Sequence, residues 1–426
     1  MTNNTIKNYL IRFYPWAIIF LSAITLVYKY VMQVSPSVMT NQLMQAFHIY
    51  GAGLGNFAAT FFYSYLIIQM FAGFLLDKYS IRGLTTIAIA ISSIGVYLFS
   101  QAHTLTVALM ARALMGVGPA FFTVSFMKLA ANWFPVNRFA FISGLLTTAV
   151  TVGAIFGEAP LAWLIIHHGW RFALIVWACF GIILTITYAF VVTNHPEGKA
   201  AVIKRSAITL RDALKVLTKG QNWILTFYSG LAFAPLAVFS GFWAPPFIRE
   251  AYHQSLTDAA SFVSISFIGL AIGGPLLGYI SDRIRNRRII MFIGAISSLI
   301  SLSIVIYLNI IPTWLLSIFL FLFGFGTGTF MLGFTVGKEI NPIALAATVI
   351  AVINTGDAVF GAFTEPLLGK FLDEGWEGKI IGGMHFFGLS DFHKAFSLLP
   401  CYLIVATLLI FFIKESATTS TDDEEK

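Results

Sequence analysis

Charged residues are scarce in this chain, and their scarcity decides the class of protein. Asp, Glu, Lys and Arg make up 11% of the 426 residues, whereas soluble domains carry roughly 25%. Hydrophobic residues make up 58%, and the mean hydropathy is +0.83. This composition excludes a soluble globular protein. It predicts an all-α integral membrane protein that crosses the lipid bilayer many times.

Patterns that would indicate disulfide bonds, nucleotide binding, catalysis or metal binding are also missing from the sequence. Cysteine occurs twice, as Cys179 and Cys401, each inside an apolar run, so no disulfide framework is expected. The glycine-rich stretch 324–328 lacks the Lys-Ser or Lys-Thr pair of a nucleotide-binding loop. The Ser, His and acidic residues have neither catalytic nor metal-ligand spacing. We therefore expect a protein that is not an enzyme and needs no cofactor or metal.

Long apolar runs fill most of the chain. We predict twelve transmembrane helices, each near the length of about 20 residues that a bilayer requires. Most of the 26 Lys and Arg residues fall in loops on the side that would hold both termini. By the positive-inside rule, both termini of this multi-pass protein are expected in the cytoplasm, with the chain in the cytoplasmic (inner) membrane. The net charge of +7 follows this loop pattern, so no nucleic-acid partner is expected. The predicted spans are 14–37, 55–76, 82–101, 105–130, 138–163, 171–192, 222–245, 257–280, 289–309, 313–337, 343–369 and 394–413.

A short loop occurs twice. The matching glycines and the matching aspartates of the two copies are the same number of residues apart. This indicates a tandem duplication of a helical membrane unit, a pattern typical of transporters. The aspartates at the helix ends can accept hydrogen bonds from helix N-termini and basic groups, and the arginines can supply countercharge. We predict that these loops form a cytoplasmic gate; a purely topogenic role for the basic residues is the alternative. The repeated residues are Gly73, Asp77 and Arg82, and then Gly278, Asp282 and Arg283.

The duplication divides the chain into four parts. We predict an N-terminal six-helix bundle over 1–192 and a C-terminal six-helix bundle over 222–415. Between them, 193–221 is the longest polar stretch, with apolar residues at helical spacing in its second part. It is expected to be a cytoplasmic linker that holds an amphipathic helix, or else a plain tether. The polar, acidic tail 416–426 is expected to be disordered.

These motifs resemble those of a known family. The repeated loop is similar to the Gly-x-Leu-x-Asp-Arg-x-Gly-Arg-Arg motif of the major facilitator superfamily, with Ser80 and Asn286 among its departures. Residues 112–118 are similar to the family's fourth-helix Arg-x-x-x-Gly-x-Gly pattern, and 133–138 to a loop of its organic anion:cation symporters and organophosphate antiporters. Residues 34–39 resemble bacterial carriers that are related more distantly to lysosomal dipeptide carriers. The resemblance implies two pseudo-symmetric six-helix bundles and transport by alternating access.

Acids within the spans are candidates for proton coupling, because an intramembrane charge is costly and marks function by default. Glu158 and Glu365 are separated by the same interval as Pro135 and Pro342, so the two acids occupy equivalent places in the halves. Embedded carboxylates can exchange protons near neutral pH. Facing water at the outer helix ends is the alternative for this pair. The other candidates are Asp357 and Arg112, for which structural pairing or anchoring is the alternative.

A basic residue in the first span is the candidate for holding a substrate's negative charge. Lys29 lies past mid-depth toward the outside, with polar side chains beside it on a helix that lines the cavity in the family it resembles. Snorkelling of its amino group to the outer surface is the alternative. The predicted substrate-binding set is Lys29, Tyr28, Tyr30, Gln33, Asn354 and Asp357.

Together these features predict a secondary active transporter. We expect proton-coupled import of a small polar nutrient, namely an organic anion, an amino acid or a short peptide, by a monomer in the lipid bilayer. The alternatives are an uncoupled facilitator, an efflux carrier for drugs or siderophores, and a membrane nutrient sensor that does not transport.

Overall fold

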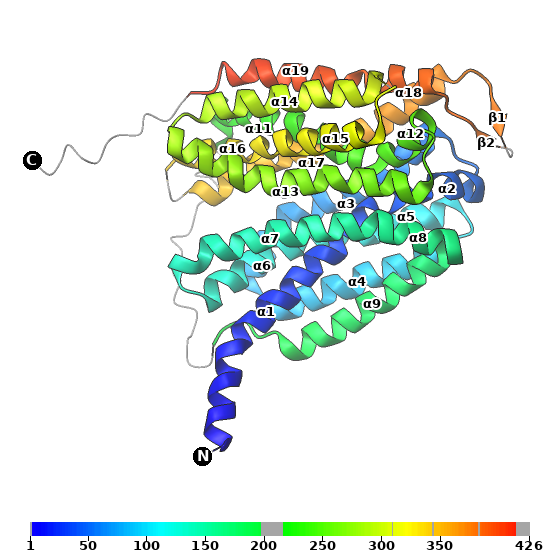
Figure 1. The fold of residues 1–426 in the computed structure, drawn as a ribbon. Coiled ribbons are helices and arrows are strands. Elements are labelled where there is room, and N and C mark those ends of the chain that lie inside the picture. The colour runs from blue at the N-terminus through cyan, green and yellow to red at the C-terminus, as the bar shows by residue number, and fades with distance from the viewer. Residues whose placement is uncertain (1, 197–215, 309, 343–344, 382–383, 415–426) are drawn as a thin grey trace, which may run out of the picture. The chain divides into compact units, whose positions relative to one another are not determined.

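The protein is described by a computed structural model that covers residues 2–196, 216–308, 310–342, 345–381 and 384–414. Helices joined by short turns make up almost all of it, with one short β-hairpin (Figure 1). The elements before residue 197 are α1 (Thr2–Val34), η1 (Ser35–Met39), α2 (Thr40–Phe47), α3 (Gly51–Lys78), α4 (Ile81–Ser100), α5 (Leu105–Val117), α6 (Pro119–Trp133), α7 (Val136–Gly157), α8 (Ala159–His168) and α9 (Trp170–Val191). Those after residue 215 are α11 (Gly220–Pro235), η2 (Leu236–Trp243), α12 (Ala244–Ala251), α13 (Leu256–Ile284), α14 (Arg287–Tyr307), α15 (Thr313–Thr327), η3 (Gly328–Phe330), α16 (Met331–Glu339), α17 (Ala346–Gly375), β1 (Ile380–Ile381), β2 (Met384–His385), α18 (Leu389–Phe396) and α19 (Leu398–Ile410).

Membrane-spanning length is reached many times along the chain. Within the described residues, 11 helical stretches are long and apolar enough to cross a bilayer. This confirms an all-α membrane fold. The sequence predicted twelve spans, and the one that does not meet the criterion is α17, which has 30 residues and carries Asn354, Asp357 and Glu365 along its length.

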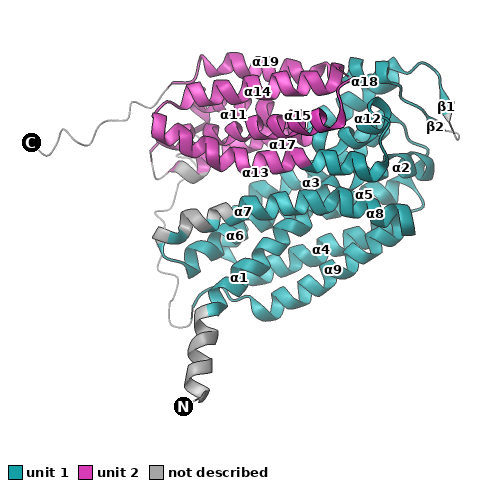
Figure 2. Cartoon of the chain, viewed as in Figure 1, with its two compact units in different colours: residues 1–204, 238–264, 362–395 teal, residues 205–237, 265–361, 396–426 magenta. Residues whose placement is uncertain are grey.

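The chain forms two compact units, which differ from the two halves of the sequence (Figure 2). Unit 1 contains residues 1–204, 238–264 and 362–395, and unit 2 contains 205–237, 265–361 and 396–426. The second part of α17 and the hairpin β1–β2 therefore pack with the N-terminal helices. The predicted pair of six-helix bundles stays a prediction.

Unit 1 is built around packed N-terminal helices. The pair α1 and α7, the pair α4 and α9, and the contacts of α5 with both α3 and α4 are its most extensive. Two of its spans break at a small residue followed closely by proline, between α5 and α6 at Gly118-Pro119 and between α7 and α8 at Glu158-Ala159-Pro160. Each break frees backbone groups inside the span, which a neighbouring segment can then contact.

Unit 2 packs α14 against α15 and α19, and α11 against α19 and α16. Small residues allow the close approaches. A Cβ on Gly356 would lie 2.9 Å from the Thr226 side chain, and a Cβ on Gly230 would lie 2.8 Å from the Gly356 carbonyl oxygen. The first part of α17 is therefore held tightly against α11.

Side-chain caps fix the helices that follow the two repeated loops. Ser80 accepts a hydrogen bond from the backbone N–H of Gly83 at the start of α4. Asn286 accepts one from the backbone N–H of Ile289 at the start of α14. Ser and Asn are favoured caps because their side chains satisfy otherwise unpaired backbone donors. The two departures from the family motif therefore have the same structural role.

Several sequence predictions fall on residues outside the described parts. These are the amphipathic helix of the linker, most of which lies within 197–215, the C-terminal tail, and the Asp77 side chain. They stay predictions.

Candidate functional site

Lys29 is buried within unit 1, near the end of α1. Its side chain is 6% exposed, and its Nζ lies 3.4 Å from the Tyr65 hydroxyl. Nζ also lies 4.5 Å from the centroid of the Tyr65 ring and 5.1 Å from that of the Tyr30 ring. Among the described residues no carboxylate oxygen lies within 4.0 Å of this nitrogen. Lys29 is thus a buried cation held by aromatic rings instead of an acid, and it does not snorkel to the surface.

Arg112 anchors the end of α1. Its guanidinium donates hydrogen bonds to the backbone carbonyls of Met32 and Gln33, the second at 2.8 Å. It also lies over the Phe61 ring, 4.9 Å from the centroid, and is 1% exposed. These carbonyls have no helical partner because α1 ends at Val34. Arg112 therefore caps α1 from α5, and its Nε has no hydrogen-bond partner among the described residues.

Glu365 lies in the part of α17 that belongs to unit 1 and is 3% exposed. Its carboxylate is within electrostatic range of the Arg112 guanidinium and of the Tyr63 hydroxyl, and among the described residues it has no ion pair within 4.0 Å. Its Oε2 has no hydrogen-bond partner among the described residues. Two of the predicted proton-coupling residues, an acid of α17 and a cation of α5, thus lie within electrostatic range in unit 1.

Glu158 has a different environment, although the sequence places it symmetrically to Glu365. It is fully buried at the break between α7 and α8, and its Oε1 accepts a hydrogen bond from the Ser37 hydroxyl at 2.9 Å. Its Oε2 has no partner among the described residues. Both acids are buried, so neither faces water at a helix end.

The other members of the predicted substrate-binding set lie in several places. Tyr28 is fully buried and donates a hydrogen bond to Ser93, so it packs away from Lys29, toward α4 and α9. Gln33 contributes its backbone carbonyl to Arg112. Tyr30 alone of these three lies beside the Lys29 amino group.

Asp357 and Asn354 belong to unit 2. Asp357 is 7% exposed and accepts a 2.6 Å hydrogen bond from the Ser229 hydroxyl of α11. Asn354 is half-buried one turn earlier on α17. Because Lys29 lies in unit 1, pairing of Asp357 with Lys29 stays a prediction.

A clamp between α3 and α17, which the sequence analysis missed, lies in unit 1. The Asp373 carboxylate accepts hydrogen bonds from the backbone N–H groups of Gly51 at 2.8 Å and Ala52 at 2.7 Å. The helix backbones nearly touch, because a Cβ on Gly55 or Gly369 would overlap backbone atoms of the other helix. We call these five residues the α3–α17 clamp. Only the spacing of glycines on two distant segments could have indicated it.

A stack of three rings lies next to the clamp. The His385 imidazole is nearly parallel to the rings of Tyr50 and Trp376, with centroid distances of 3.6 and 3.5 Å and interplanar angles of 10°. Tyr50 precedes α3, Trp376 follows α17, and His385 ends β2. The stack therefore joins the same two helices through the hairpin.

Replacement of Asp373 with alanine is expected to lower the melting temperature of the purified protein by about 4 °C, because two charge-assisted hydrogen bonds to a helix N-terminus are lost. The measurement is differential scanning fluorimetry. Glu374→Ala is the matched control, since Glu374 is exposed and pairs with Lys370 in the preceding turn. Equal melting temperatures for wild type and Asp373→Ala would show that the clamp contributes nothing.

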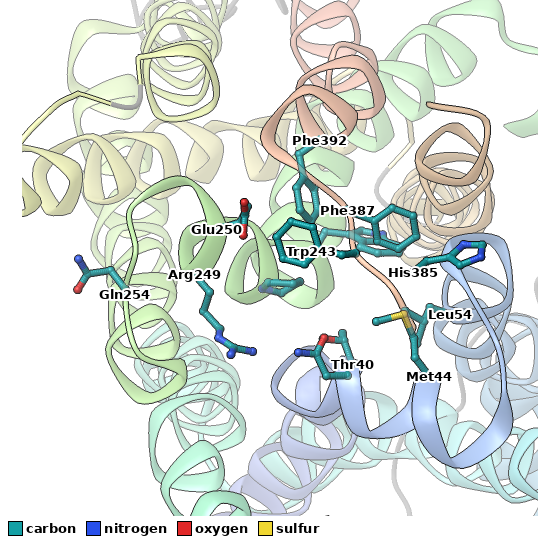
Figure 3. Close-up of a pocket in the computed structure, with 13 residues that line it drawn as sticks. Thr40, Met44, Leu54, Trp243, Arg249, Glu250, Gln254, His385, Phe387 and Phe392 are labelled. Atoms are coloured by element: carbon teal, nitrogen blue, oxygen red, sulfur yellow. The ribbon is translucent and has the colours of Figure 1, made fainter. Parts of the chain in front are cut away.

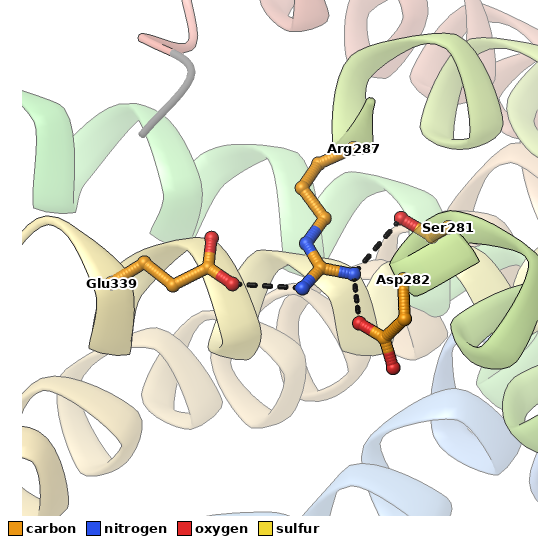
Figure 4. A network of polar contacts seen from close by, with 4 residues as sticks. All are labelled: Ser281, Asp282, Arg287 and Glu339. Carbon is orange, nitrogen blue, oxygen red and sulfur yellow. Dashed lines mark hydrogen bonds and ion pairs between the residues drawn. The ribbon is translucent and has the colours of Figure 1, made fainter. Parts of the chain in front are cut away.

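The second repeated loop holds a network of charged residues in unit 2 (Figure 4). The Arg287 guanidinium bridges Asp282, at the end of α13, and Glu339, at the end of α16, with a distance of 2.8 Å to the Glu339 carboxylate. It also donates a hydrogen bond to Ser281 at 3.2 Å. The predicted aspartate is thus paired, and its partner is Arg287, whereas the sequence analysis assigned the countercharge to Arg283.

The first repeated loop is held by a different side chain. The Asn194 amide accepts a hydrogen bond from the backbone N–H of Arg82 at 2.9 Å and donates one to Ser80 at 3.0 Å. A residue shortly after the end of α9 therefore fixes the turn between α3 and α4. Gly73 and Gly278 both have open space around them, so close packing does not explain either glycine.

Replacement of Arg287 with glutamine is expected to lower the melting temperature by about 3 °C, since it leaves two carboxylates without their shared cation. Asp282 is largely exposed, which limits the effect. Arg283→Gln, at an exposed neighbouring arginine, is the control and should melt with wild type. An unchanged melting temperature for Arg287→Gln would mean that water replaces the network without loss.

Residues 18–365 match the Major Facilitator Superfamily. The chain belongs to the Major Facilitator Superfamily. It is 22% identical to the probable galactarate/D-glucarate transporter GudP of Bacillus subtilis, over 88% of this chain and 88% of the relative. It is also 22% identical to the probable sulfoacetate transporter SauU of Cupriavidus necator, over 63% of this chain and 67% of the relative.

The fold agrees with this membership. A bacterial homologue of the human lysosomal transporter Spinster, solved in an inward-facing and occupied conformation, has a TM-score of 0.75 and 14% identity. The match covers 95% of this chain and 97% of that one. This superfamily member is therefore a multi-pass membrane transporter of small molecules, and not an enzyme.

Proposed function

We propose that the protein imports a small organic anion together with protons. The observation that carries the proposal is Lys29, a cation buried in the membrane-spanning part of unit 1 with no carboxylate within 4.0 Å among the described residues. A buried charge without a counter-ion is costly, so the site gains stability when a ligand brings the missing negative charge. The carboxylate of a substrate would meet the Lys29 amino group beside the Tyr65 hydroxyl.

The buried charges also explain why protons would accompany the anion. An anion that enters unit 1 adds a negative charge to a region that already holds Glu158 and Glu365. Protonation of one of these acids removes a negative charge and so offsets the cost of burying the substrate. Glu365 is the better candidate because its protonation also ends its attraction to Arg112, which caps α1.

The relatives favour the substrate class. SauU and GudP are named for sulfoacetate and for galactarate and D-glucarate, which are all small organic anions. A buried lysine suits such molecules better than it suits amino acids or peptides, because these carry an amino group of like charge. We therefore propose hydroxylated or sulfonated carboxylates as substrates, in preference to amino acids and short peptides.

The predicted bundles, gate loops and other substrate-binding residues would complete a transport cycle. Two six-helix bundles in the cytoplasmic membrane, with both termini inside, would alternate access as a monomer. Asp357 and Asn354 are further candidates for substrate contact. The loops that contain Asp77 and Asp282 would latch the cytoplasmic gate, and Arg287 is the cation that holds Asp282.

The test is uptake into proteoliposomes that contain the purified protein. We expect accumulation of radiolabelled D-glucarate, galactarate or sulfoacetate when the outside is more acidic, and collapse of this accumulation by a protonophore. Equal uptake with and without the proton gradient would support an uncoupled facilitator instead. Accumulation only with the reversed gradient would support an efflux carrier, and ligand binding with no flux in any arm would support a sensor.

A further inference from the structure

A cavity of about 190 Å³ lies in unit 1, lined by residues from η1 to the start of α3, from Trp243 to Gln254 around α12, and from β2 to α18 (Figure 3). Its volume equals that of about six water molecules, at roughly 30 Å³ for each in the liquid. A carboxylic acid with about four carbons fits such a space. None of its lining residues belongs to the Lys29, Arg112 and Glu365 group.

Two residues that line the cavity carry hydrogen-bond donors without partners among the described residues. Trp243 is 1% exposed, and its indole Nε1 has no acceptor among the described residues. Arg249 is half-buried and has no hydrogen bond or ion pair within the described parts of the chain, and it extends toward Thr40 (Figure 3). A buried donor without an acceptor is costly, and a guanidinium matches the two oxygens of a carboxylate.

The rest of the lining suits hydroxyl groups on a carbon chain. The Glu250 carboxylate points away from the Arg249 guanidinium, so the cavity has one cationic and one anionic side (Figure 3). Glu250 can accept hydrogen bonds from hydroxyl groups, as can the hydroxyl of Thr40 and the amide of Asn41. The rings of Phe387 and Phe392 offer an apolar surface for the carbon atoms.

We propose that this cavity is a second binding site, which holds a small hydroxylated monocarboxylate. The carboxylate group binds the Arg249 guanidinium, and a turn of the Trp243 ring brings its buried indole N–H to the same group. The hydroxyl groups face Glu250, Thr40 and Asn41. A single cation at this site favours a monoanion over a dianion, because a second carboxylate would meet Glu250.

The bound ligand would connect three segments that are distant in sequence. Arg249 lies on α12, Thr40 begins α2 and Phe387 follows β2. The same region contains the α3–α17 clamp, whose α3 also contributes Leu54 to the cavity. Occupancy of the cavity would therefore stabilise the arrangement in which these segments meet.

The experiment is isothermal titration calorimetry of the full-length protein in lipid nanodiscs. L-threonate, a four-carbon monocarboxylate, is the probe, and L-threitol, which has the same carbon chain but no carboxylate, is the matched ligand. Titrations are performed in the Lys29→Gln background, so that the substrate site proposed above does not contribute to the heat. We expect saturable binding of L-threonate there and none of L-threitol.

Substitutions then assign the binding to the cavity. We expect Arg249→Gln to weaken L-threonate binding at least tenfold, Arg249→Lys to restore part of it, and Trp243→Phe to weaken it several-fold. Lys370→Gln, which removes an exposed lysine that does not line the cavity, should bind as the Lys29→Gln parent. Should Arg249→Gln fail to fold, Arg249→Lys and Trp243→Phe decide in its place.

Three results would overturn the second site. They are the absence of L-threonate binding in the Lys29→Gln background, equal binding of L-threitol, and affinity that the Arg249 and Trp243 variants leave unchanged. None of them affects the proposed transport at Lys29, which uptake into proteoliposomes tests separately.

Discussion

Replacement of Lys29 with glutamine is expected to lower the uptake of the transported anion at least about 100-fold, which corresponds to roughly 2.7 kcal/mol. The amide keeps the polarity of the side chain but removes the charge that would attract the substrate's carboxylate. Its neighbours Tyr30 and Tyr65 cannot replace that charge. The measurement is the initial rate of uptake into proteoliposomes, over a range of substrate concentrations.

Two further variants separate charge from folding. Lys29→Arg should keep part of the activity, because the cation remains beside the same rings. Lys370→Gln removes an exposed lysine that pairs with Glu374 and should transport as wild type. If Lys29→Gln took up the anion at the wild-type rate, the substrate's negative charge would have to be held elsewhere.

Replacement of Glu365 with glutamine is expected to abolish accumulation driven by a proton gradient while anion exchange continues. The amide resembles the protonated acid, so the variant is held in the form that accepts substrate and has no proton to release. Exchange of internal for external anion requires no net proton movement and should stay within about twofold of wild type. Both rates are measured in the same preparation of proteoliposomes.

Glu158→Gln distinguishes the two buried acids. Glu158 is hydrogen-bonded to Ser37 and has no ion pair within 4.0 Å among the described residues, so its amide variant should keep proton-driven accumulation. If accumulation were lost in Glu158→Gln and kept in Glu365→Gln, the coupling role would belong to the acid of α7–α8. Accumulation that survives both substitutions would exclude both acids as the coupling group.

The fold could be predicted because its signals are local and repeated. Apolar length gives the spans, and the recurrence of Gly73-x-x-x-Asp77 as Gly278-x-x-x-Asp282 gives the duplication. The span that fell short of the apolar criterion, α17, was still predicted at 343–369, because apolar residues separate its polar ones. The linker between the halves was also evident from its length and polarity, although its structure lies outside the described residues.

The functional groups were predicted as residues but not as contacts. Lys29, Arg112 and Glu365 were found because charges are rare in spans. Their grouping depends on how α1, α5 and α17 pack, which no local pattern encodes. Tyr28 was predicted to bind substrate because it is adjacent to Lys29 in the sequence. Adjacent residues on a helix face different directions, however, and Tyr28 packs against Ser93.

Tertiary hydrogen bonds were not accessible from the sequence. Asp373 looks like one of many acids near a helix end, and its contact with the backbone of Gly51 joins residues far apart in the chain. Arg287 was one of four arginines in its loop, and only the position of Glu339 on α16 distinguishes it from Arg283. In both cases the deciding partner comes from a different helix.

The His385 stack provides a spectroscopic reporter for this region. Its imidazole lies between two aromatic rings at 3.6 and 3.5 Å, where ring currents shield protons on the imidazole carbons. In NMR spectra these protons should resonate upfield of those of an exposed histidine such as His103. Since Tyr50 precedes α3 and Trp376 follows α17, separation of these helices would remove the shielding. The chemical shift of one side chain would therefore report whether the α3–α17 clamp is intact.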